Sequence, residues 1–136
     1  MEKVYSKIKP DILLHIINKN EEINPQRQDL SPETEYLQVA CFSVNKEKGV
    51  KAHKHIKQIR TGDITQESWL VLKGSIEIIL YDLDDKPIAK KTLGPGDCLI
   101  TFRGGHTYKA LEDDTTIYEY KTGPYMGKGS DSTSLN

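Results

Sequence analysis

The sequence predicts a single all-β domain in which antiparallel strands form a barrel or a sandwich. Short runs rich in β-branched and aromatic residues recur along the chain, at residues 36–44, 69–72, 75–81, 88–91, 98–102 and 116–120. Turn-forming residues separate these runs at short intervals, at residues 73–74, 82–87, 94–97, 104–105 and 112–114. The length of 136 residues fits one domain of ordinary size.

The two ends of the chain differ in composition from this strand-rich middle. Residues 11–17 form a brief apolar run that fits either a short helix or a buried strand, and residues 21–35 read as a polar, proline-containing loop. We therefore divide the chain into residues 1–35, which pack on the barrel, the barrel itself at 36–126, and a polar tail at 127–136. The tail has almost nothing to bury and is expected to be mobile when no partner is present.

Charge and hydropathy exclude several classes of protein. Nineteen basic and twenty acidic residues give a net charge of −1, so no long-range positive field favours nucleic acid or anionic lipid. No apolar run approaches the roughly 20 residues that span a bilayer, and we see no secretion signal, so we expect a cytoplasmic protein. Cys41 and Cys98 lie far apart in apolar runs, as expected of buried, reduced thiols.

Three of the four histidines stand in a pattern that suits a metal ion. His53 and His55 are separated by one residue, so in a strand both imidazoles project from one face and one ion can bind both. Glu67 opens the next strand-like run, and His106 follows a strand and a pair of glycines. His15 has no partner in the sequence and is expected to be an ordinary, partly buried histidine.

This pattern resembles the two sequence motifs of the cupin superfamily, over residues 49–110. The resemblance implies a small antiparallel jelly-roll barrel with an N-terminal extension and a site in its mouth. It also implies that His53, His55, Glu67 and His106 hold a divalent metal, for which Zn, Fe, Mn or Ni would each suit imidazole and carboxylate ligands.

The pleat of the strands predicts which neighbours share this site. Eleven residues separate His55 from Glu67, and a shift of the pleat by one residue would turn Gln66 toward the mouth instead. If Glu67 faces inward, Trp69 lies on the same face and either lines the pocket or packs in the core. Tyr108 shares its face with His106. In the last strand either Glu119 or the tyrosines, Tyr118 among them, reach the interior.

The leading functional hypothesis is a metal-dependent isomerase or epimerase acting on a sugar or a related polar molecule. Glu119 and Tyr108 are the predicted catalytic residues, because a carboxylate or a phenol beside a metal can move a proton. Trp69, Lys51 and Tyr118 are the predicted substrate pocket. Lys51 belongs to a basic run around the histidines that either attracts an anionic substrate or is simply a solvated loop.

Two other functions remain open at this point. The same metal ligands would serve an iron-dependent dioxygenase, and a barrel that grips a carbohydrate without turnover would be a binding module. The ending of the chain, residues 118–127, resembles small bacterial cupins linked with sugar and surface-polysaccharide pathways. We also expect a homodimer, because exposed strand edges of small barrels are often paired between copies.

Overall fold

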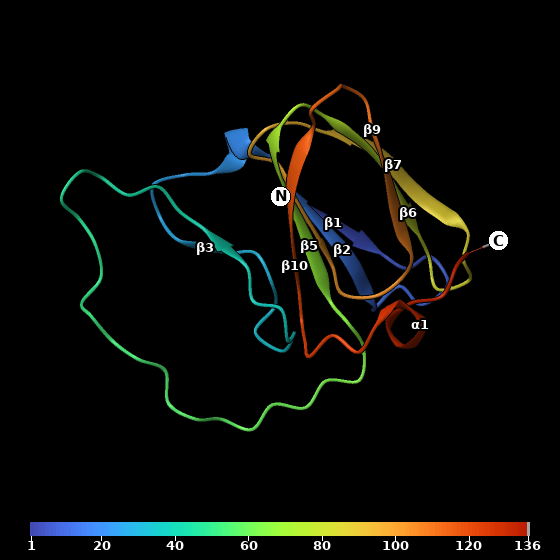
Figure 1. The fold of residues 1–136 in the computed structure, drawn as a ribbon, viewed down its shortest axis with the longest axis horizontal. Coiled ribbons are helices and arrows are strands. Elements are labelled where there is room, and N and C mark those ends of the chain that lie inside the picture. The colour runs from blue at the N-terminus through green and yellow to red at the C-terminus, as the bar shows by residue number, and fades with distance from the viewer. Residues whose placement is uncertain (136) are drawn as a thin grey trace.

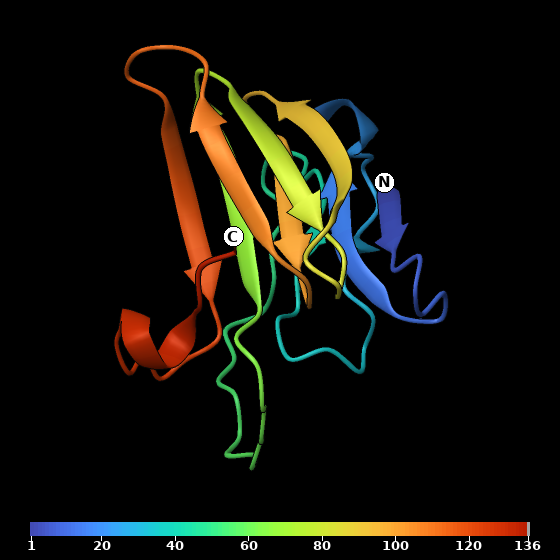
Figure 2. The ribbon, with the colours of Figure 1, turned by 90° about the vertical axis from the view of Figure 1, so that its right-hand side faces the viewer.

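Two antiparallel β-sheets lie face to face in the computed structural model, which describes residues 1–135 (Figures 1 and 2). The larger sheet has five strands, in the order β1 (Glu2–Tyr5), β2 (Leu13–Asn18), β8 (Cys98–Thr101), β5 (Glu67–Lys73) and β10 (Thr116–Lys121). The smaller sheet has three, in the order β7 (Pro87–Leu93), β6 (Ile76–Tyr81) and β9 (His106–Ala110). The predicted all-β class is confirmed, and the apolar run at 11–17 belongs to a strand.

The main core fills the space between the two sheets. Inward side chains alternate along β6, where Ile76, Ile78 and Leu80 are fully buried, as expected of a strand with one face on the core. From β5 in the opposite sheet, Trp69 and Val71 pack against them. The core is completed by Val4, Ile17, Leu93 and Leu99.

A second, smaller core covers the outer face of the larger sheet. The two short strands β3 (Gln28–Asp29) and β4 (Ala40–Cys41) pair there, and Leu30 packs on Ile16, Ile100 and Phe102. The predicted loop at 21–35 thus contains the 3-10 helix η1 (Asn20–Glu22) and β3. Of the strand predicted at 36–44, only β4 forms. Outside β4 the run makes isolated backbone hydrogen bonds, such as the one from the Leu30 amide to the carbonyl oxygen of Val39 at 2.8 Å, and forms no further ladder.

Residues 42–66, which we call the arm, form a long loop that extends away from the two sheets (Figure 1). The expectation that His53 and His55 lie in a strand is therefore wrong for this structure. Both side chains are exposed, with ring centroids 5.6 Å apart, and His53 Nδ1 lies 2.9 Å from the carbonyl oxygen of Lys51. No backbone ladder between strands reaches this part of the arm.

The two sheets do not close into a barrel within residues 1–135. The outermost strands are β1 and β10 in one sheet and β7 and β9 in the other, and no ladder joins the sheets. In place of the barrel predicted for 36–126, the strands form an open sandwich, and β1 and β2 from the segment 1–35 belong to its larger sheet. In the same range, no helix has the length and apolar character that crossing a membrane requires.

The end of the chain packs beside the open sandwich. It forms the short helix α1 (Lys128–Asp131), and the side chain of Leu135 then lies against Gly105. Asn136, the last residue of the tail predicted to be mobile, lies outside the described residues. Cys41 and Cys98 are both free and half-buried.

Candidate functional site

A cluster of polar and aromatic side chains surrounds Trp69, on the side of the sandwich bounded by β9 and β10. The indole ring of Trp69 meets the rings of His106 and Tyr108 edge-on, each with a centroid separation of 4.9 Å. Its Nε1–H donates to Glu119 Oε2 at 3.3 Å. We call Glu67, Trp69, His106, Tyr108 and Glu119 the Trp69 cluster.

Strand register explains why these residues meet. Glu67 and Trp69 are two residues apart on β5, and Glu119 on β10 is directly opposite Trp69. His106 and Tyr108 are two residues apart on β9, in the facing sheet. Since side chains alternate in a strand, each pair projects from one face, and the facing sheets bring the pairs together.

Glu67 and His106 form the acid–base pair of the cluster. Glu67 Oε1 lies 3.6 Å from His106 Nε2, and both side chains are mostly shielded from solvent. Burial alone would raise the pKa of the Glu67 carboxyl, but the hydrogen bond and the positive charge of His106 outweigh burial and hold this pKa below its ordinary value. The carboxylate is therefore the favoured form of Glu67, and it can orient the imidazole by accepting a hydrogen bond from it.

The other ring nitrogen of His106 is a notable feature of the cluster. Nδ1 is buried and has no hydrogen-bond partner within residues 1–135. Leaving a buried polar atom unpaired costs free energy, so such atoms are rare and are found where a protein binds or reacts. Among the described residues only Asn18 Oδ1 is in the same condition, so His106 contributes to the cluster one of two buried polar side-chain atoms that are still able to bind a further group.

A charged network continues from the cluster to the end of the chain. Lys121 Nζ lies 3.2 Å from Glu119 Oε1 and 3.8 Å from Asp131 Oδ2, and Thr65 Oγ1 donates to Asp131 Oδ1 at 2.6 Å. The hydrogen bond with Glu119 raises the pKa of Lys121. Helix α1 is thus attached to β10 and to the end of the arm, at the edge of the cluster.

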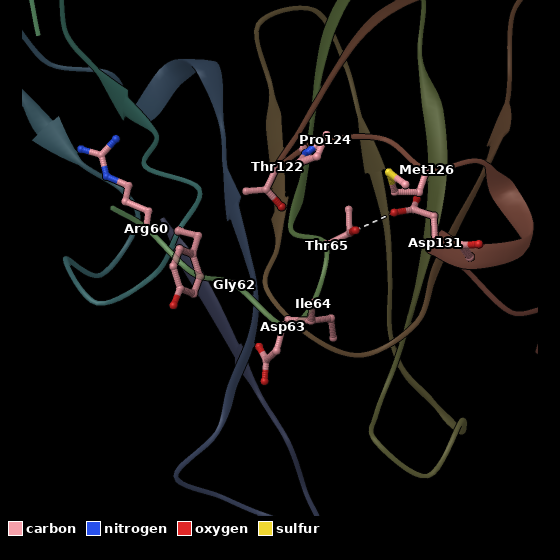
Figure 3. Close-up of a pocket in the computed structure, with 12 residues that line it drawn as sticks. Arg60, Gly62, Asp63, Ile64, Thr65, Thr122, Pro124, Met126 and Asp131 are labelled. Carbon is pink, nitrogen blue, oxygen red and sulfur yellow. Dashed lines mark hydrogen bonds between the residues drawn. The ribbon is translucent and has the colours of Figure 1, made fainter. Parts of the chain in front are cut away.

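An open cavity of about 500 Å³ lies beside this network (Figure 3). Its walls come from the end of the arm, including Arg60 and Asp63, and from Thr65, Thr122 and Asp131. Figure 3 shows the arm residues on one side and Asp131 with Met126 on the other. Two residues of the cavity wall are close in sequence to the cluster. Thr65 precedes Glu67 by two residues, and Thr122 follows Lys121, which pairs with Glu119.

His15 lies behind the cluster in a fully buried position. Its Nε2 is 3.4 Å from the carbonyl oxygen of Tyr81, and its Nδ1 is 3.1 Å from Thr101 Oγ1. A carbonyl can only accept, so Nε2 carries the proton and Nδ1 accepts from the Thr101 hydroxyl. Burial lowers the pKa of His15 to about 4, although the Tyr81 carbonyl opposes the shift. His106 lowers this pKa further and Asp82 raises it.

This buried histidine predicts a loss of stability in mild acid. Below pH 6.5 the unfolded chain protonates His15, whereas the folded chain resists protonation down to about pH 4, so stability is complete above 6.5 and declines as pH falls. Between pH 7 and 5 the decline in free energy of unfolding is about 2 kcal/mol. Urea unfolding at the two pH values measures it, and His15→Gln should remove most of the difference. An equal decline in the variant would contradict the assignment.

The lowered pKa of the Glu67 carboxyl does not interfere with the measurement on His15. Because the pKa of Glu67 is lowered in the folded protein, its contribution is present above 4.5 and is lost only as pH falls through its folded value. The interval from pH 7 to 5 therefore isolates His15 from Glu67.

The structure brings together five of the nine residues singled out from the sequence, namely the members of the Trp69 cluster. Lys51, His53 and His55 lie on the exposed arm and contact none of the five. Tyr118 projects from the opposite face of β10 to Glu119 and neighbours the ring of Tyr120, 6.0 Å away. Gln66 does not turn toward the mouth, which was the alternative left open by the sequence. It is buried beneath residues 35–37 and accepts a hydrogen bond from the Leu37 amide.

The four residues expected to bind a metal are not assembled in this arrangement. Glu67 and His106 lie together, while His53 and His55 remain on the arm, and within residues 1–135 no three His, Cys, Asp or Glu side chains are grouped closely enough to hold an ion. Two donors alone do not make the ligand set of a stable site for these metals. No step of the chemistry below passes through a metal.

Two residues of the site were not anticipated from the sequence. Lys121 pairs with Glu119 and is opposite Glu67 in the β5–β10 register, and its position two residues after Glu119 was the available signal. Asp131 comes from a segment with no periodic pattern, so nothing in the sequence pointed to it.

Comparison with known proteins adds no further constraint: no family model matches the chain, and no curated protein or solved structure is significantly similar to it.

Proposed function

We propose that this chain is a small cupin-type jelly-roll protein that binds a polar small molecule at the Trp69 cluster and moves a proton on it. The observation that carries the proposal is the convergence of four groups capable of binding or proton transfer on one side of the sandwich, around the buried indole of Trp69. Ligand sites typically combine an apolar floor with a few convergent polar groups and shifted pKa values, as this cluster does. The order of strands in the two facing sheets supports the jelly-roll assignment.

The chemistry of the cluster favours a sugar or a sugar derivative as the ligand. Tyr108 is half-exposed, and Glu119 presents its carboxylate beside it, so hydroxyl groups of a ligand can both donate and accept there. Rings of Tyr108 and His106 offer apolar edges to the C–H faces of a sugar. Lys121 adds a positive charge that suits a substrate carrying a carboxylate or a phosphate.

Within this proposal the reaction is an isomerisation or an epimerisation, in which a proton leaves the carbon beside a carbonyl. In an isomerisation a proton returns to the former carbonyl carbon, and in an epimerisation it returns to the opposite face of the same carbon. Glu119 and Tyr108 are the groups that would remove and return the proton, because they are the accessible members of the cluster. His106, held in place by Glu67, would donate to the carbonyl oxygen and stabilise the negative charge that develops there. Trp69 acts as a positioning residue, because it contacts three of these four side chains or donates to them.

A metal-dependent enzyme, either an isomerase or an iron-dependent dioxygenase, would require the arm to move. Imidazole and carboxylate ligands suit a divalent ion, but His53 and His55 would have to leave their positions on the arm to join Glu67 and His106. A binding module without turnover is the second candidate. It is favoured by the hydrogen bond between Trp69 and Glu119, which already engages the carboxylate in a structural role.

Ligand binding can be measured directly, because Trp69 is the chain's single tryptophan. Its emission is expected to shift when a ligand contacts the cluster. We suggest titrating the protein with hexoses, hexuronic acids and sugar phosphates, and we expect at least one class to change the emission with saturation below 1 mM, about −4 kcal/mol of binding. If none of the three classes changes the emission, the proposed site is wrong. Tyr118→Phe, on the opposite face of β10, is the control that should bind normally.

A further inference from the structure

The sandwich is bridged along one side and open along the other. At the bridged side, Lys91 of β7 lies 3.1 Å from Glu2 of β1. At the other side, β9 and β10 are both outermost strands, and most of their residues are exposed (Figure 2). An edge strand presents unpaired backbone N–H and C=O groups, which can pair with another strand. The open side can therefore accept an additional strand between β9 and β10.

The arm carries apolar side chains that would be buried if the arm paired with another strand. Val50, Ile56 and Ile59 are 85%, 76% and 91% exposed, far more than isolated apolar residues need to be on a folded surface. Residues 50–60 also have the β-branched content of a strand, and a turn precedes them, in which the Lys48 amide donates to the carbonyl oxygen of Asn45 at 3.1 Å. In a solvated loop these apolar side chains contribute no burial energy to the stability of the fold.

Charge is also complementary between the arm and the body of the protein. Six basic and two acidic residues give residues 42–66 a net charge of +4, and since the whole chain carries −1, the rest carries −5. At the open side, the four acidic residues Glu112, Asp113, Asp114 and Glu119 outnumber Lys109 and Lys121 of β9 and β10, so residues 106–121 carry a net charge of −2. Opposite charges of this kind favour docking of the arm on that side.

The arm's attachment favours a second copy of the chain as the molecule that receives it. Its first residues are held where the Ser43 amide donates to Asn24, at 3.3 Å, and its last where Gln66 and Thr122 exchange hydrogen bonds at 3.0 Å. The middle of the arm projects away from the two sheets, on the side remote from β9 (Figure 1), whereas its end lines the cavity beside Thr122 and Asp131. In a two-fold dimer the arm of each copy would dock on the sandwich of the other copy. The symmetry then forms the same arm–sandwich contact twice.

We propose that the protein is a dimer in which the arm of each copy is added as a strand to the open side of the other, along β9 and β10. An arm of this length supplies a large part of the roughly 20–30 residues that a stable interface uses on each side. The exchange moves the middle of the arm, which holds His53 and His55, to the side on which His106 and Tyr108 lie. The proposal depends on the sheet edges and the arm alone, so it stands apart from the proposed function.

Isotope-mixed cross-linking tests the exchange on the unmodified chain. Equal amounts of ¹⁴N- and ¹⁵N-labelled protein are refolded together from urea and treated with an amine-reactive cross-linker. We expect a dimer by sedimentation, and we expect peptides that join Lys54 or Lys57 to Lys109 with one light and one heavy partner, at about the frequency of random pairing. A monomer, a dimer without these peptides, or peptides that pair only within one isotope would each overturn the proposal.

A pair of variants makes the same test at the arm itself. Ile56→Asp combined with Ile59→Asp should produce a monomer at concentrations at which the wild type is a dimer, while the strands of the body remain folded by circular dichroism. Leu83→Asp changes an exposed apolar residue in the turn between β6 and β7, away from the open side, and should leave the dimer intact. Dimers that persist in the arm variant would overturn the proposal even if the fold is unchanged.

Discussion

Replacing Trp69 by alanine is expected to lower the free energy of unfolding by about 3–5 kcal/mol. Trp69 is only 5% exposed and packs between the two sheets with Val71, Ile78 and Leu80. Its removal leaves a cavity too large for the neighbouring strands to fill, and it frees Glu119 from its hydrogen bond. Since a domain is stable by only about 5–15 kcal/mol in total, the variant should be close to unfolding at room temperature.

Urea unfolding followed by circular dichroism measures this loss, because the variant has no tryptophan emission. Leu72→Ala is the matched control on the same strand: Leu72 is 46% exposed, so its truncation should cost about 1 kcal/mol or less. Trp69→Phe should fall between the two, because it keeps an aromatic ring but loses the N–H donor. Equal effects of Trp69→Ala and Leu72→Ala would show that Trp69 is not a core residue.

The parts of the fold that the sequence predicts well are those with a clear alternation and clear turns. The runs at 75–81 and 98–102 become β6 and β8 because apolar residues recur at every second position or fill a fully covered strand. The same alternation predicts that Trp69 shares a face with Glu67 and that Tyr108 shares one with His106, and the structure puts both pairs in one cluster. Period and parity are local properties, so one sequence is enough to infer them.

Strand pairing is the part that one sequence does not determine. The run at 36–44 and the H-x-H segment have strand-like composition, yet outside β4 neither forms a ladder, because pairing depends on a partner far away in the chain. Conversely, β9 has little apolar character and was not anticipated as a strand, and it forms because β6 presents an edge to it. The choice between Gln66 and Glu67 likewise depends on Thr122, which fixes the backbone of Gln66.

The proposed chemistry predicts that Glu119→Gln slows proton exchange on the ligand at least about 100-fold, while ligand affinity changes less than tenfold. The glutamine oxygen can still accept from Trp69 Nε1, which Glu119 does now at 3.3 Å, so the cluster keeps its geometry and loses only the base. The measurement is deuterium incorporation from D₂O, followed by NMR, into the sugar to which Trp69 emission responds. Binding is measured on the same samples by that emission.

Tyr108→Phe separates the two groups that could move the proton. Phenylalanine retains the edge contact with Trp69, where the ring centroids are 4.9 Å apart, and removes only the hydroxyl. If Glu119 removes the proton and Tyr108 returns it, both variants slow exchange. Unchanged exchange in both variants would exclude both residues from proton transfer. Saturable binding without any exchange in the wild type would instead support a binding module, because the same side chains can recognise a sugar without transforming it.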